Sequence, residues 1–190
     1  MTIDKVTLEI LKNHTRAAAE SMAYTLYRTA HSTFVKETED FTTGLTTADG
    51  ETFATPTELG ATWFVGLNYG RAIKMIDDYN PGDICITNDP YSGFVCTHPP
   101  DMHIWKPIFY QSEVVAFSVG HIHNTDVGGA VPASLSRSLS ELIGSITAIW
   151  LKTFGLLRRL IRLKQAFKEW IAILTTMNVF SVTFRMRHHP

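Results

Sequence analysis

The sequence is poor in cysteine, in acidic residues over its last quarter and in uninterrupted apolar segments. Its 190 residues include only two cysteines, Cys85 and Cys96, and these do not form a CxxC pair. This argues against a disulfide framework or a cysteine zinc site, and it favours a reduced, cytoplasmic protein. The N-terminus also lacks the basic segment and apolar core of a secretory signal, so we expect no export.

Charge is distributed unevenly along the chain. Residues 1–141 contain 9 Lys/Arg and 17 Asp/Glu, whereas residues 142–190 contain 8 Lys/Arg and a single acid, Glu169. We therefore predict an N-terminal domain over 1–141 and a divergent basic amphipathic tail over 142–190. Lys152 and Arg158 interrupt the apolar stretch of the tail before the ~20 residues of a membrane span accumulate. No aromatic pattern accompanies the basic residues, so neither membrane insertion nor nucleic-acid binding is expected.

Hydrophobic periodicity predicts an α+β domain with a mixed sheet and packed helices, followed by a helical basic tail. Helices are expected over 4–30, 57–78 and 142–174, and strands over 41–47, 51–54, 83–87, 107–110 and 113–120. Asp4 is a candidate N-cap for the long first helix. Asp49-Gly50 tolerates the positive φ of a hairpin turn, and Pro81-Gly82 would end the second helix.

Four of the eight histidines lie close together in the sequence, between positions 98 and 123. His98 and Asp101 are separated by two prolines, which fix φ and stiffen the loop. His121 and His123, at i and i+2, would lie on one face of a strand. A single histidine is more often a hydrogen-bonded core or surface residue, but imidazole and carboxylate grouped in this way are the usual ligands of zinc-like or manganese-like ions. The pattern favours a metal-dependent enzyme or a piece of one.

A series of motifs occurs in order over residues 4–141. The motifs are Glu39-Asp40-Phe41-Thr42, Ala48-Asp49-Gly50, Pro81-Gly82-Asp83, Asn88-Asp89-Pro90-Tyr91-Ser92-Gly93, Thr97-His98-Pro99-Pro100-Asp101, His123-Asn124-Thr125-Asp126-Val127-Gly128-Gly129 and Pro132-Ala133-Ser134. Together they resemble the N-terminal part of the hydantoinase B family. That family includes B-type subunits of ATP-dependent N-methylhydantoinases, 5-oxoprolinases, caprolactamases and ketone carboxylases.

The resemblance implies a divalent metal, with zinc, manganese and iron as candidates, because two carboxylates and two imidazoles suit these ions. The implied ligands are Asp40, His98, Asp101 and His123. The resemblance also implies a partner, a hydantoinase A-type ATPase subunit that binds ATP and phosphorylates the substrate. The implied function is that of a metal-carrying subunit of an enzyme that opens hydantoin, oxoproline or lactam rings.

Further residues are expected around the metal. Many relatives carry paired histidines where this chain has His123-Asn124. His121 therefore either replaces the second histidine as a ligand or contacts the ligands without binding the ion itself. Asp126 would either orient His123 or cap the following turn. Asn88 and Asp89 would either line the pocket or form an Asx-turn.

The resemblance ends near Glu141, and members of the family run far longer than this chain. A fragment of a cyclic-amide hydrolase subunit is therefore the first hypothesis. A subunit fragment of a ketone carboxylase and a catalytically inactive truncated remnant are the alternatives. Whether the chain is itself an enzyme stays open at this point.

Overall fold

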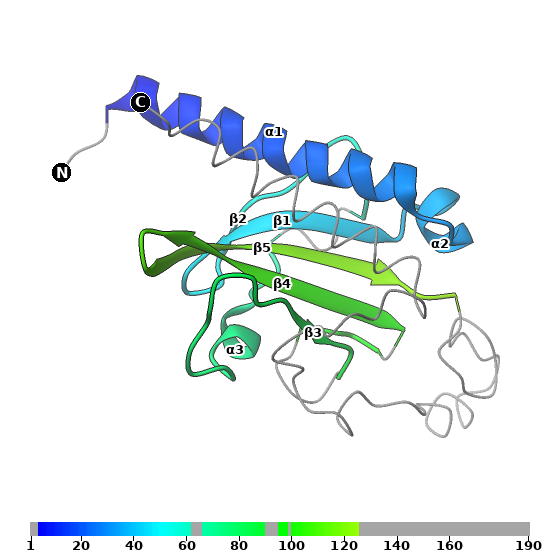
Figure 1. Ribbon diagram of the computed structural model, residues 1–190. Coiled ribbons are helices and arrows are strands. Elements are labelled where there is room, and N and C mark those ends of the chain that lie inside the picture. Colours follow the sequence, from blue (N-terminus) through cyan, green and yellow to red (C-terminus); the bar gives the residue numbers. More distant parts are fainter. Residues whose placement is uncertain (1–3, 62–65, 90–94, 99, 126–190) are drawn as a thin grey trace.

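The computed structural model describes residues 4–61, 66–89, 95–98 and 100–125. Its elements in chain order are α1 (Lys5–Thr29), α2 (Thr33–Lys36), β1 (Phe41–Thr47), β2 (Thr52–Ala54), α3 (Gly70–Ile73), β3 (Cys85–Thr87), β4 (Asp101–Tyr110) and β5 (Glu113–His123). The strands form one five-stranded sheet in the order β2-β1-β5-β4-β3, and all described neighbours are antiparallel. Figure 1 shows α1 running along the sheet beside β1 and β2, with α3 on the other side.

The long helix α1 confirms the helix expected over 4–30. Asp4 caps it, since the carboxylate accepts a hydrogen bond from the backbone N–H of Thr7 at 3.0 Å. The second half of the helix buries a stripe at helical spacing, formed by Ala19, Met22, Ala23 and Leu26. This stripe packs on one face of the sheet.

The hairpin of β1 and β2 confirms the turn expected at Asp49-Gly50. Gly50 adopts a φ of 90°, which a side chain would disfavour. A Cβ atom at Gly50 would also overlap the backbone nitrogen of Gly70. The turn therefore packs backbone to backbone against the start of α3.

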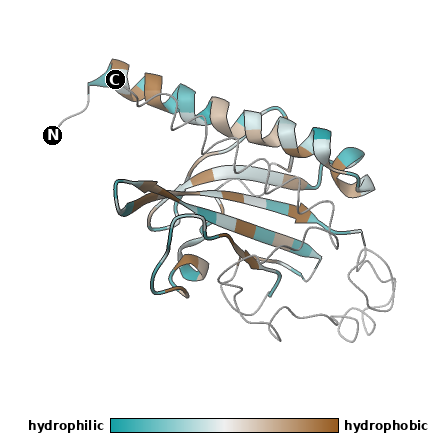
Figure 2. Ribbon diagram, in the orientation of Figure 1, coloured by the Kyte–Doolittle hydropathy of each residue, from teal (hydrophilic) through white to brown (hydrophobic). Residues whose placement is uncertain are grey.

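The hairpin of β4 and β5 presents two differently covered faces. Because side chains alternate along a strand, the register places Met102 and Ile122 on the face covered by α1. The same register places Trp105 and Val119 on the opposite face, where they pack with Tyr69 in a second apolar cluster. Figure 2 shows hydrophobic and hydrophilic residues interspersed along both strands. Polar side chains that project from this second face therefore share it with the apolar cluster of Trp105, Val119 and Tyr69.

The helix expected over 57–78 is wrong in its extent. Its first residues form bends, and α3 is a single helical turn. Gly60 has a φ of 98°, outside the helical region, and the backbone N–H of Ala61 donates to the carbonyl oxygen of Phe41. These contacts with the start of β1 hold the segment in a non-helical path. Local periodicity does not encode them.

The sheet differs from the expected mixed sheet, because its described strand pairs are all antiparallel. A short strand within 83–87 is confirmed by β3. Both long strands extend beyond the expected 107–110 and 113–120, since β4 begins at Asp101 and β5 ends at His123. The candidate ligands at those positions therefore belong to the sheet.

The tail expected over 142–190, with its helix over 142–174, lies outside the described residues, and the predicted boundary near residue 141 stays a prediction. Within the part of the chain that the structure describes, no helix combines the length and the apolar character that a membrane crossing requires.

Replacing Gly60 by alanine tests the contact that overrides the helical pattern. A Cβ atom there would lie 2.7 Å from the carbonyl oxygen of Phe41, in addition to the strain of a left-handed φ. The matched control is Gly82→Ala, because Gly82 has a φ of 94° with no atom within 4 Å of its added Cβ. We expect both variants to lose about 1 kcal/mol of unfolding free energy from φ, and Gly60→Ala to lose at least about 1 kcal/mol more. Urea denaturation measures both, and equal losses would contradict the role of the close contact.

Candidate metal centre

Four ionisable side chains lie in two adjacent rows on the face of the sheet opposite α1. The register pairs Asp101 with His123 and, two residues further into the sheet, His103 with His121. All four side chains project from the same face because their positions differ by two along each strand. The rows lie where β4 begins and β5 ends.

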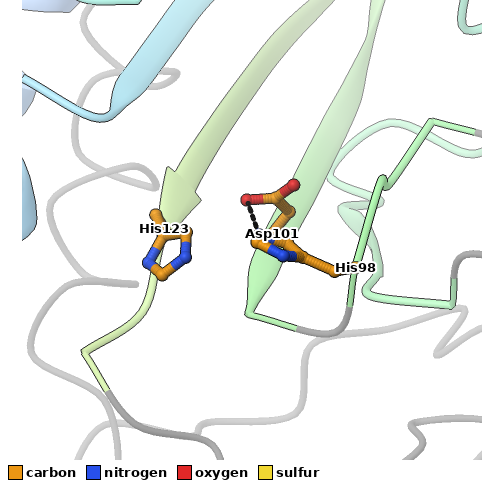
Figure 3. Close-up of side chains that lie close together, drawn as sticks. All are labelled: His98, Asp101 and His123. Carbon is orange, nitrogen blue, oxygen red and sulfur yellow. Dashed lines mark ion pairs between the residues drawn. The ribbon is translucent and has the colours of Figure 1, made fainter. Parts of the chain in front are cut away.

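His98 joins the first row from the loop that precedes β4. Its Nε2 lies 3.1 Å from Oδ1 of Asp101, and its ring centroid lies 5.0 Å from that of His123. One ligand atom from each of these three residues lies within 4.8 Å of the other two, and Figure 3 shows the three side chains together. The His98 side chain is 35% exposed, whereas Asp101 and His123 are buried. The cluster is therefore accessible from the His98 side.

Asp101 is an ionised carboxylate inside the protein. Burial alone disfavours its charge, but hydrogen bonds from His121, His98 and Thr97 more than offset this cost and hold its pKa well below the ordinary value. The bond from His121 Nε2 to Oδ1 is 3.0 Å long, and the bond from Thr97 Oγ1 to Oδ2 is 2.6 Å long. Both carboxylate oxygens are thus held in place by neighbouring donors.

His123 supplies a neutral imidazole. Burial lowers the pKa of its ring, and this outweighs the opposing attraction of Asp40 and Asp101. The ring stacks on Phe34 with centroids 4.5 Å apart, and its Nδ1 has no hydrogen-bond partner among the described residues. A buried imidazole nitrogen without a partner beside an ionised carboxylate suits a divalent ion, because ligating nitrogen must be deprotonated. The residues present therefore fit a metal site.

Asp40 lies beside this cluster but contacts it through the backbone. Its carbonyl oxygen accepts a hydrogen bond from the backbone N–H of His123 at 3.0 Å. The hydrogen bond to Asp101 raises the pKa of His98, and the charge of Asp40 adds to that effect. The Asp40 carboxylate is not among the ligand atoms that the described residues bring within 4.8 Å of one another. Its role as a fourth ligand stays a prediction.

A second cluster contains a residue that sequence reasoning did not select. Asp101, His103 and His121 also offer ligand atoms within 4.8 Å of one another, and all three are buried. His103 was missed because the strand was expected to begin at 107. The alternation of Asp101 and His103, at i and i+2, was the signal that could have placed both on one strand face.

The flanking residues have definable local roles. Asn88 and Asp89 follow β3 and are buried, and the backbone N–H of Asp89 donates to Oγ1 of Thr87. Asn124 donates through its side-chain amide to the carbonyl oxygen of Pro100 at 2.9 Å. It joins the end of β5 to the loop before β4. Asp126 lies outside the described residues.

Thr97→Val tests how the carboxylate of Asp101 is stabilised. The substitution removes a donor at nearly constant volume, and we expect it to lower the unfolding free energy of the metal-free protein by about 1.5 to 3 kcal/mol, because the bond goes to a buried charge. The control is Thr29→Val, whose exposed hydroxyl bonds only backbone carbonyls of its own helix. Urea denaturation in the presence of a chelator measures both. A loss no larger than that of the control would show that the bond contributes little.

The sequence profile of the Hydantoinase B/oxoprolinase family matches residues 4–145. The chain is 30% identical over 142 residues to the B-type subunit of a putative D-/L-hydantoinase from Pseudomonas sp. (strain NS671), and the match covers 70% of this chain and 23% of that protein. It is 28% identical over 151 residues to the 5-oxoprolinase of Dictyostelium discoideum, covering 73% and 11%. An uncharacterized protein of Methanocaldococcus jannaschii is 34% identical over 145 residues, covering 74% and 25%.

The fold is similar to two solved structures. The ATP-dependent caprolactamase from Pseudomonas jessenii aligns with a TM-score of 0.68 and 22% identity over 99% of this chain and 35% of that one. A nucleotide-free acetone carboxylase aligns with a TM-score of 0.61 and 22% identity over 92% of this chain and 24% of that one. The chain spans a quarter or less of the curated relatives described above. With a profile match that covers most of its length, this chain belongs to the Hydantoinase B/oxoprolinase family.

Proposed function

We propose that this chain is the metal-carrying fragment of a subunit of an ATP-dependent cyclic-amide hydrolase that acts on a hydantoin, oxoproline or lactam ring. The observation that carries the proposal is the cluster of His98, Asp101 and His123. The similarity to a putative hydantoinase and to a 5-oxoprolinase supports the substrate class.

Each residue of the cluster would contribute a different property to metal binding. Asp101 provides the negative charge, His123 provides a neutral nitrogen in a buried position, and His98 faces the accessible side. Because an ionised carboxylate can only accept, the proton in the contact with Asp101 lies on Nε2 of His98. An ion would bind either at Nδ1 or at Nε2, and binding at Nε2 would release that proton. We propose zinc, manganese or iron as the ion, with Asp40 as a fourth ligand.

The chemistry of ring opening accounts for the need for both a metal and ATP. A ring amide is a poor electrophile, so a hydantoinase A-type ATPase subunit is proposed to phosphorylate its oxygen and make it a better leaving group. A divalent ion held by this chain would supply Lewis acidity toward an oxygen of water or substrate. Asp101 and His123 would hold that ion against the buried face of the sheet, and the partly exposed His98 side would stay accessible to substrate.

Two alternatives each have a specific observation in their favour. A ketone carboxylase subunit is favoured by the fold similarity to an acetone carboxylase. An inactive remnant is favoured by length, because the chain spans a quarter or less of the curated relatives. Retention of a metal by the purified chain discriminates against a remnant whose site has been lost.

Metal content of the purified chain tests the proposed site. We expect about one zinc, manganese or iron ion per chain, and at least a tenfold loss in His98→Ala, because this variant removes the accessible ligand without opening a large cavity. His14→Ala is the control, since His14 is exposed on α1 and far along the chain from the cluster. Elemental analysis by mass spectrometry after dialysis gives the stoichiometry. Equal metal in the wild-type chain and His98→Ala would contradict the assignment.

The activity of the chain with a partner tests its proposed status as a fragment. We mix the purified chain with an A-type ATPase subunit, ATP and either hydantoin or 5-oxoproline, and we expect no ATP-dependent ring opening, because the chain spans a quarter or less of the curated relatives. A complete two-subunit hydantoinase is the positive control, and chromatography of the ring-opened acid is the measurement. Turnover by the chain would show that these 190 residues suffice.

A further inference from the structure

A row of buried side chains lies directly behind the proposed metal ligands. His121 and His103 are cross-strand partners on the same face as Asp101 and His123, one row further into the sheet. Both rings have no exposed surface, and their centroids lie 4.7 Å apart. The proposed ligand set includes neither of them, so their burial in this position calls for a separate explanation.

The contact between His121 and Asp101 has a defined direction. An ionised carboxylate has no proton to donate, so Nε2 of His121 carries the proton and donates it to Oδ1 at 3.0 Å. The other oxygen, Oδ2, accepts from Thr97 at 2.6 Å. Because two donors from different elements hold the two oxygens, the carboxylate plane of Asp101 has little freedom to rotate.

The row is anchored at its other end by Tyr69. The Tyr69 hydroxyl lies 2.9 Å from Nδ1 of His103, and the Tyr69 ring is buried in the apolar cluster that contains Trp105. A continuous series of contacts therefore runs from Asp101 through His121 and His103 to Tyr69. It joins the carboxylate of the proposed metal site to the apolar core of the sheet.

We propose that His121, His103 and Tyr69 form a positioning unit that orients Asp101 for metal binding, an inference that rests on the proposed function. His121 holds the carboxylate directly, His103 packs against the His121 ring and restricts its rotation, and Tyr69 fixes His103. Residues that hydrogen-bond a metal ligand in this way generally raise metal affinity by a factor of about 10 to 100.

A second ion at Asp101, His103 and His121 is the competing explanation, because their ligand atoms also lie within 4.8 Å of one another. Asp101 is the single carboxylate in the two clusters that the described residues form. Even with the Asp40 carboxylate counted beside Asp101, two divalent ions would leave two uncompensated positive charges next to fully buried histidines, which is costly. The charge balance therefore favours one ion, with the second row as its support.

Two substitutions of His121 separate positioning from a general role in packing. Glutamine places an N–H at the same number of bonds from Cβ as Nε2 of histidine, whereas leucine ends one bond shorter and has no donor. We expect Zn²⁺ affinity to fall about 10- to 100-fold in His121→Leu and to stay within about threefold of wild type in His121→Gln. The absorption spectrum of bound Co²⁺ should change in the leucine variant only. His14→Ala is again the control.

Two further measurements keep the inference testable if His121→Leu does not fold. Tyr69→Phe removes only the hydroxyl that bonds His103, and we expect it to weaken Zn²⁺ binding by about threefold or more. Nitrogen-15 NMR of the wild-type chain should show His121 protonated on Nε2, both with and without Zn²⁺. A His121 ring protonated only on Nδ1 would overturn the inference, as would Zn²⁺ affinity unchanged in Tyr69→Phe.

The outcomes distinguish this inference from the proposed function. A wild-type chain that binds no Zn²⁺, Mn²⁺ or Fe²⁺ would overturn both. One bound ion that His98→Ala removes, with affinity and spectrum unchanged in a folded His121→Leu, would overturn the positioning unit alone. Two bound ions, one of which is lost on His103→Ala, would replace it with a second metal site. Zn²⁺ binding that is weakened in His121→Leu and close to wild type in His121→Gln supports the positioning unit.

Discussion

The antiparallel register of β4 with β5 is the constraint on which the candidate site depends. It places Asp101 opposite His123 and His103 opposite His121, so that two rows of polar groups meet on one face of the sheet. If the pairing shifted by one residue, the polar side chains of β4 or those of β5 would move to the opposite face, among the apolar residues that contact α1. The register is held by the apolar residues of both faces, and the cluster of His98, Asp101 and His123 is therefore a consequence of the core.

The ionised carboxylate of Asp101 is the electrostatic centre of this arrangement. A buried charge is costly unless several donors compensate it. Here the donors come from the loop before β4 through Thr97 and His98 and from β5 through His121. The same donors fix the direction of the carboxylate, so one set of contacts both compensates the charge and orients the group. A single hairpin with its preceding loop supplies both the charge and its donors.

The sequence by itself determined the features that depend on near neighbours. The cap at Asp4, the turn at Asp49-Gly50 and the grouping of His98 with Asp101 are all readable because each involves residues a few positions apart. The clustering of histidines and the family motifs both singled out His123, and the register of β4 with β5 is what places it opposite Asp101.

Only the tertiary structure decided which distant residues became neighbours. It stopped the helix expected from residue 57 through contacts with β1, connected Asp40 to His123 through a backbone carbonyl, and joined His121 and His103 to Tyr69. The physical reason is that helical periodicity and motif spacing report interactions along the chain, whereas cross-strand partners are selected by the register that best buries both faces of the sheet.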